Sequence, residues 1–121
     1  MAIEFYGATR EAERTVNRLL SLPASGHEQD WEFELADPHR VQEMLDAMET
    51  DLSFDERCAV ALLTIASIDE AVDAGNVDPG DVQRANSILM RYAQVREAMI
   101  FYWVGQKRAS NLESIKKVLA L

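Results

Sequence analysis

Apolar side chains recur every three or four residues along most of this 121-residue chain, which is the spacing of a buried helix face. In residues 9–22 the members of one such stripe are Ala12, Val16, Leu19 and Leu20. Thr9 can cap the start of this helix, and Pro23 stops it. A second stripe consists of Val41, Met44, Leu45 and Met48, and the outward residues of the same helix are Glu43, Asp46 and Glu49. The pattern predicts a mainly α-helical protein.

Capping residues mark four helix starts. Asp37 and Asp78 each stand before a proline, which is the arrangement of an N-cap acid followed by proline in the first turn. The segments 53–56 and 110–113 both read Ser-x-x-Glu, the spacing of a capping box in which serine bonds forward and glutamate bonds back. We expect a helix to begin at each of these places.

The helix expected over residues 54–74 is apolar on nearly all sides between residues 59 and 66. Such a helix is stable only when other helices surround it. Gly75 stops it, and a long fourth helix is expected over residues 79–104, before a short last one. The chain is predicted to form a bundle of about five helices around the central apolar helix, in a single domain spanning residues 1–121.

Residues 30–36 follow a different period, because apolar and acidic residues alternate one by one. That period is typical of a half-buried strand. Ile3 and Phe5 alternate around an acid in the same way, so the first helix could join two strands as a small β-α-β unit at the N-terminus. The alternative is that residues 2–6 begin the first helix, which Gly7 disfavours.

The net charge is −9 and it is unevenly placed. Residues 1–27 hold three acids and three bases, residues 28–81 sixteen acids and two bases, and residues 82–121 two acids and seven bases. Nucleic acids and anionic membranes attract lysine and arginine and repel carboxylates, so this balance argues against both as partners. A partner is expected to be a basic protein.

The sequence holds no familiar catalytic or cofactor-binding motif. Walker, Gly-x-Gly-x-x-Gly, Gly-x-Ser-x-Gly, Cys-x-x-Cys and His-Glu-x-x-His signatures are all missing. A metal site would need His27 and His39 to converge with carboxylates such as Asp30 or Asp37. Cys58, the single cysteine, lies in the apolar run of the central helix, where a thiol behaves as a small hydrophobe. We therefore expect no enzyme activity, cofactor or metal.

Acidic residues close the expected central helix. Asp69 and Asp73 stand one turn apart, where two like charges cost roughly a few tenths of a kcal/mol unless a cation or basic side chain lies across them. We expect both carboxylates to be solvated by water.

Phe101, Tyr102 and Trp103 are consecutive aromatic residues on the expected fourth helix. Three consecutive helical positions span about 200°, so these side chains cannot all enter one apolar stripe. Either the last helix together with Trp31 and Phe33 covers them, or they form an aromatic patch at an interface. Tyr102 and Trp103 are therefore candidate partner-binding residues.

Two features bear on localisation. Residues 1–6 lack the basic segment and long apolar stretch of a signal peptide. The most apolar stretch, residues 58–68, is too short to span a membrane. Both features predict a cytoplasmic protein.

Three segments together resemble small acidic uncharacterised proteins of bacteria: residues 30–38 (DWEFELADP), residues 52–56 (LSFDE) and the late pair Tyr102-Trp103. In size and acidity the chain is similar to immunity proteins, which neutralise a toxin by binding it. The resemblance covers residues 30–104, consists of capping and packing motifs, and implies no functional residue.

The leading hypothesis is a non-enzymatic protein-binding module with an acidic face for a basic partner, and its most concrete form is immunity or antitoxin-like neutralisation. The candidate binding residues are Glu32, Glu34, Glu43, Asp46, Glu49, Tyr102 and Trp103. A salt bridge from Arg84, Arg91 or Arg96 to most of these acids would argue against the face. The alternatives are a small-ligand protein or enzyme with an unrecognised pocket, and a structural subunit that associates with copies of itself.

Overall fold

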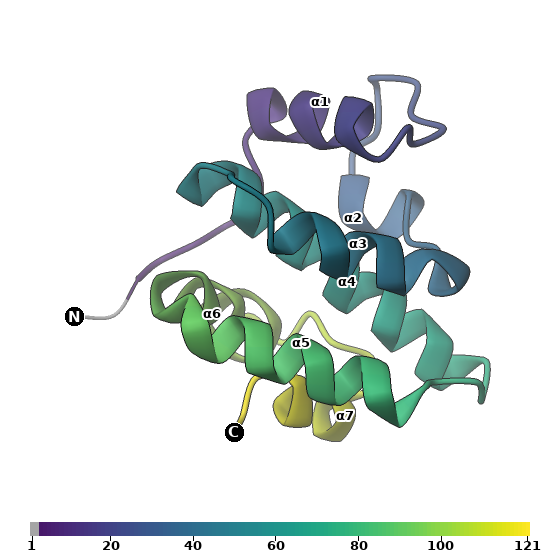
Figure 1. Ribbon diagram of the computed structural model, residues 1–121, viewed down its shortest axis with the longest axis vertical. Helices are drawn as coiled ribbons and strands as arrows, with labels where there is room; N and C mark the ends of the chain where they lie inside the picture. The colour runs from purple at the N-terminus through teal and green to yellow at the C-terminus, as the bar shows by residue number, and fades with distance from the viewer. Residues whose placement is uncertain (1–2) are drawn as a thin grey trace.

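Residues 3–121 are described by the computed structural model, and they form seven α-helices, one 3-10 turn and one π-helical segment (Figure 1). In chain order these elements are α1 (Arg10–Leu19), α2 (Trp31–Glu34), η1 (Pro38–Arg40), α3 (Val41–Met48), α4 (Phe54–Asp73), α5 (Pro79–Arg91), α6 (Ala93–Met99), the π-helical η2 (Ile100–Gly105) and α7 (Leu112–Val118). The prediction of a mainly helical protein is confirmed.

Helix α4 runs through the middle of the molecule. In Figure 1, α1, α2 and α3 lie on one side of it and α5, α6 and α7 on the other. Helix α4 contacts α1, α2, α3, α6 and α7, and all twelve residues from Cys58 to Asp69 are buried. Twelve residues make more than three turns, so the helix is covered on every side. The prediction of a central apolar helix is confirmed, with its last turn followed by Gly75 at φ +74°.

Three of the four predicted helix starts are confirmed by their capping bonds. Glu56 N donates to Ser53 Oγ at 3.1 Å and Ser53 N donates to Glu56 Oε1 at 2.9 Å, which completes the capping box of α4. Asp37 Oδ1 accepts from His39 N at 2.9 Å, at the start of the 3-10 turn that leads into α3. Asp78 caps α5 in the same way.

The capping box predicted at residues 110–113 is wrong. Helix α7 begins at Leu112, and Asn111 precedes it without a side-chain cap. The backbone amides of Ser110 and Asn111 instead donate to the two carboxylate oxygens of Asp69, each at 2.9 Å. A buried carboxylate from α4 thus takes the place of the local cap, so the expectation that Asp69 is solvated is also wrong.

The strand predicted over residues 30–36 is wrong, because Trp31–Glu34 is one turn of helix. The amides of Phe33 and Glu34 both donate to Asp30 O, and Glu34 Oε2 accepts from Asp30 N at 2.8 Å. The alternation also fits this geometry, because Trp31 and Leu35 are one helical turn apart and are both buried. No strand occurs in the described part of the chain, so the β-α-β unit is not formed.

Residues 3–9, here called the N-terminal arm, have no regular secondary structure. Ile3 and Phe5 pack partly buried against the core, and Gln106 Nε2 donates to Phe5 O at 3.1 Å. Neither the predicted strand nor the alternative helix forms over residues 3–6, and residue 2 lies outside the described residues. Figure 1 shows the arm crossing the edge of the bundle before α1 begins.

The single long helix predicted over residues 79–104 is broken at Tyr92, whose backbone lies at φ −112° and ψ +72°. The break lets α5 and α6 pack against each other, while α6 also covers α4. The Tyr92 ring lies 4.1 Å below the guanidinium of Arg57, which holds it at the turn. This break and the extra turn α2 account for seven helices where about five were predicted.

Candidate functional site

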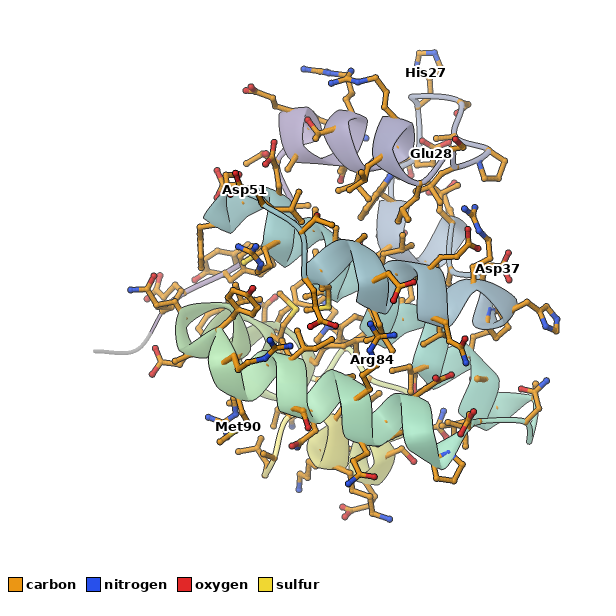
Figure 2. All side chains as sticks on the ribbon, viewed as in Figure 1. His27, Glu28, Asp37, Asp51, Arg84 and Met90 are labelled. Atoms are coloured by element: carbon orange, nitrogen blue, oxygen red, sulfur yellow. The ribbon has the colours of Figure 1, made fainter. Side chains whose placement is uncertain are left out.

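The outward acids of α3 face basic residues of α5. Arg84 Nη2 lies 2.7 Å from Asp46 Oδ1 and 2.8 Å from Glu49 Oε1, and Arg91 Nη2 lies 2.7 Å from Glu49 Oε2. Figure 2 shows Arg84 reaching from α5 toward α3. Hydrogen bonds from Arg91 and Arg84 lower the pKa of Glu49. This part of the predicted acidic face is therefore largely neutralised within the chain.

Two more predicted acids are engaged close to their own positions. Glu43 Oε2 accepts from Arg40 Nε at 2.8 Å, and this hydrogen bond lowers the pKa of Glu43. Glu34 is exposed and holds the amide of Asp30 through one carboxylate oxygen. Both acids lie outward as predicted, but each already has a partner on its own segment.

Glu32 does not lie outward, and its predicted place on the acidic face is wrong. It is buried, and Tyr102 Oη donates to Glu32 Oε2 at 2.5 Å. Burial, followed by this hydrogen bond, raises the pKa of Tyr102. The pair joins α2 to η2 across the core, so neither residue is exposed to a partner.

Trp103 is completely buried as well. Its ring meets Phe33 edge to face with centroids 5.5 Å apart, and it meets Tyr102 at 5.1 Å. Among residues 3–121, its Nε1 finds no hydrogen-bond partner. Phe101 points the other way and packs on Tyr6 at 5.3 Å. The aromatic run is covered from within by Phe33 and by the N-terminal arm.

The arginines of the last third of the chain reach only some of the candidate acids. Arg84 and Arg91 reach Asp46 and Glu49, which are two of the five. Arg96 Nε donates instead to the carbonyl of Leu119 at 2.7 Å. Salt bridges from these arginines to most of the five acids would have argued against the face, and only two of the five are bridged. Glu32 is buried and Glu43 is paired with Arg40, however, so little of this face is left for a partner.

A different acidic feature lies where α1 and α4 begin. A cleft of about 120 Å³ there, the acidic cleft, is lined by Thr9, Glu11, Ala12, Thr15, Ser53, Asp55 and Glu56. Asp51 lies on the loop that enters α4, on the same side of the molecule as the start of α1 in Figure 2. Among residues 3–121, no salt bridge involves Glu11, Asp51 or Asp55. Sequence reasoning missed this cleft because it treats first-turn acids as caps of separate helices.

Several basic side chains bind carbonyl groups rather than acids. Arg57 donates to the carbonyls of Met48 and Leu52 at 3.0 Å each and to that of Thr50 at 2.5 Å. Arg96 binds the carbonyls of residues 119 and 120. These guanidinium groups stabilise loops and chain ends without neutralising a carboxylate, so the acidic surplus remains at the surface.

The histidines, the cysteine and the acids that could support catalysis or bind a metal do not come together within residues 3–121. Within residues 3–121, no three His, Cys, Asp or Glu side chains lie close enough to hold a metal ion. His27 stands on an outer loop in Figure 2, well away from Asp37. Burial raises the pKa of the Cys58 thiol to about 12, which keeps it protonated and unreactive near neutral pH.

Two further findings concern the chain as a whole. Across residues 3–121, no helix is both long enough and apolar enough to cross a membrane. In comparisons with known proteins, the chain matches no protein-family model, no curated protein and no solved structure.

Proposed function

We propose that this chain is a non-enzymatic protein-binding module that presents the acidic cleft to a basic protein. The observation that carries the proposal is the set of carboxylates at the starts of α1 and α4, in which Glu11, Asp51 and Asp55 form no salt bridge within residues 3–121. The acidic cleft replaces the acidic face that was first expected on α2 and α3. The acids of that earlier face are paired with other groups of the chain or buried.

The charge of the cleft remains negative after the helix dipoles are counted. Each helix start carries about +0.5 of an elementary charge, so the two starts together offset about one carboxylate. Glu11, Asp55 and Glu56 all line the cleft, which leaves an excess of roughly two negative charges before Asp51 is added. A lysine or arginine side chain fits both this charge and the hydroxyl acceptors of Thr9 and Ser53.

The binding energy of such a face is modest for each contact. An exposed ion pair contributes about 0 to 1 kcal/mol, so several are needed for a stable complex. The larger effect of the charge is on encounter, since complementary fields raise association rates. Immunity or antitoxin-like neutralisation is the most concrete form of the proposal, because fast encounter with a basic protein is the property that such a charged face supplies.

The test compares two charge-reversal variants that change the net charge equally. Glu11→Lys with Asp55→Lys alters the acidic cleft, and Glu70→Lys with Glu113→Lys alters exposed acids elsewhere. The tagged full chain is used to capture partners from the cells that produce it, and the captured protein is then purified and titrated. We expect a basic protein whose affinity falls at least about tenfold, or about 1.4 kcal/mol, with the cleft variant and less than about threefold with the control.

Folding and ionic strength provide the controls. Lysine at a helix start costs roughly 0.3 to 1 kcal/mol through the helix dipole, so the melting of both variants is measured and binding is compared well below either transition. The affinity of the wild-type complex should fall as salt rises from about 50 mM to about 300 mM, because exposed charges are screened. A captured protein that is acidic, or that binds both variants equally, contradicts the proposal.

A further inference from the structure

A hollow with two arginines lies along the later turns of α1, whereas the acidic cleft lies at the start of that helix. This arginine hollow has a volume of about 350 Å³ and is lined by Arg14, Asn17, Arg18, Leu22, Ala24, Ser25 and Gly26. Helix α1 supplies the first three of these residues, and the loop that follows it supplies the other four. Its volume is within the range of pockets that hold small molecules, about 300 to 1,000 Å³.

The hollow forms because the chain turns back over α1. The turn is at Ser21, whose backbone is left-handed with φ +49°, and Leu22 N closes it by donating to Asn17 O at 2.9 Å. The loop that follows is held in shape by the carboxylate of Glu28. This carboxylate accepts from Ser25 N at 2.7 Å and from Ser25 Oγ at 2.8 Å. The wall of the hollow is therefore organised before any ligand binds.

Arg14 and Arg18 differ from the other arginines of this protein. The other seven each form a salt bridge, bind a backbone carbonyl or lie over a tyrosine ring. Within residues 3–121, the guanidinium groups of Arg14 and Arg18 have no such contact. Both are exposed and one helical turn apart, where like charges repel and destabilise the helix. An anion bound to both would relieve this repulsion.

Asn17 adds a third donor to the hollow. Its Oδ1 accepts from the Nε1 of the buried Trp31 at 2.8 Å. Because an indole N–H only donates, the amide oxygen must face Trp31, and Nδ2 is left without a hydrogen-bond partner within residues 3–121. The hollow thus combines two guanidinium groups with an amide donor, and Leu22 and Ala24 add an apolar wall.

The acids near the hollow do not cancel its charge. Glu28 is buried, and hydrogen bonds from the loop satisfy both of its oxygens. On α1, Glu13 is paired with Arg10, and Glu11 lines the acidic cleft. Asp30 stands further along the chain, at the start of α2. Two positive charges therefore face at most one carboxylate that is already engaged, in a protein whose net charge is −9.

We propose that the arginine hollow binds a small phosphate monoester, with the phosphate held by both guanidinium groups and the organic part lying against Leu22 and Ala24. A phosphate monoester carries about −1.5 to −2 charges near pH 7 and has three strong acceptor oxygens. A carboxylate carries a single charge on two oxygens. Two arginine forks and one amide donor match the phosphate better in both charge and number of donors.

The ligand is a small soluble molecule rather than a membrane or a nucleic acid. Either of these would extend beyond the hollow and meet the acidic surplus of the remaining surface, which repels it. A single phosphate group meets only the charges within about one Debye length, roughly 8 to 10 Å. The site is distinct from the acidic cleft, so the inference goes beyond the proposed function and does not depend on it.

The test titrates three anions into the isotopically labelled full chain at about pH 7.5, where a phosphate monoester is mostly a dianion. The probes are phenyl phosphate, inorganic phosphate, which lacks the organic part, and benzoate, which lacks the second charge. Binding is followed by the backbone amide shifts in two-dimensional NMR spectra. We expect phenyl phosphate to shift the amides of Arg18, Ser25 and Gly26 with a dissociation constant on the order of 1 mM. The other two anions should bind at least about fivefold more weakly.

A matched pair of double variants locates the effect. Arg14→Gln with Arg18→Gln removes two positive charges from the hollow, and Lys107→Gln with Lys117→Gln removes two elsewhere. All four residues are exposed, so both variants should fold, and their melting is measured as a check. We expect the arginine variant to weaken phenyl phosphate binding at least about tenfold and the lysine variant to weaken it less than about twofold.

Each contrary outcome overturns a stated part of the inference. Benzoate binding as tightly as phenyl phosphate would overturn the phosphate, and inorganic phosphate doing so would overturn the apolar wall. An arginine variant that binds as well as wild type, or shifts confined to other surfaces, would overturn the site. Tighter binding to acetyl-Ala-phosphoserine-Ala-amide, or to vesicles of phosphatidylcholine and phosphatidic acid, than to phenyl phosphate would overturn the small soluble ligand. The proposed function fails by a different result, a partner that is indifferent to reversal of Glu11 and Asp55.

Discussion

Asp69 is expected to contribute strongly to stability because its buried carboxylate holds the chain segment before α7. It is 4% exposed and accepts from Ser110 N, Asn111 N and Asn111 Nδ2, each at 2.9 Å. Asp69→Asn keeps the shape but turns one acceptor oxygen into a donor that faces other donors. A hydrogen bond to a charged group contributes about 1.5 to 3 kcal/mol, and an orphaned buried donor costs about 1 to 3 kcal/mol. We expect Asp69→Asn to lower the free energy of unfolding by about 3 kcal/mol.

The assay is urea unfolding together with amide hydrogen exchange. For a chain of this length, about 3 kcal/mol corresponds to a melting temperature lower by roughly 10 °C. The increase in exchange rate should be largest in α7, because Asp69 holds residues 110 and 111 directly before that helix. In α1 the exchange rate should rise only as much as the loss of global stability requires.

The matched control is Asp73→Asn, one turn further along α4. Asp73 is exposed and accepts one bond, from Asn111 Nδ2 at 2.8 Å, so its loss should stay below about 1 kcal/mol. The reasoning would be refuted by a loss below about 1 kcal/mol for Asp69→Asn, or by equal losses for the two variants.

Two further predictions concern the core and the loop before α2. Leu62→Ala and Leu63→Ala should each lower the free energy of unfolding by about 2 to 5 kcal/mol, because both leucines are completely buried in the central helix. Urea unfolding measures this cost, and a value below about 1 kcal/mol at both sites would contradict the prediction. Hydrogen bonds from the backbone and side chain of Ser25 lower the pKa of Glu28 from 4.5 to about 2. The unfolded chain therefore binds the proton more tightly, so the stability from Glu28 is complete above about pH 4.5 and is lost as the pH falls toward 2. Unfolding midpoints of wild type and Glu28→Gln should differ at pH 6 and converge at pH 2, and a constant difference would contradict the assignment.

Local signals in the sequence were sufficient for the central helix and for most helix starts. Ser53 and Glu56 bond as their spacing predicts, and an apolar surface on all sides required α4 to be surrounded. The alternation at residues 30–36 misled because seven residues are too few to separate a strand from one helical turn. The buried carboxylate of Glu32 is satisfied by a hydrogen bond from Tyr102, which lies seventy residues later in the chain.

The candidate site shows the same division between local and distant information. Helical periodicity placed Glu43, Asp46 and Glu49 outward correctly, but it carried no information on Arg84 and Arg91, which lie on another helix. The acidic cleft combines residues 9–15 with residues 53–56, two segments that are far apart in the chain. Such sites follow from tertiary packing, which a single sequence without relatives does not specify.

The contact between Phe5 and Gln106 has a consequence for the order of folding during synthesis. The arm meets its partners, Gln106 and Tyr102, only after about one hundred further residues have been made, which takes roughly 5 to 20 s at ribosomal rates. During that interval Phe5 and Tyr6 have no η2 to cover. The contact of the Phe5 ring with Tyr102 is therefore made only on a finished chain, so a nascent or truncated chain leaves both the arm and this side of η2 uncovered.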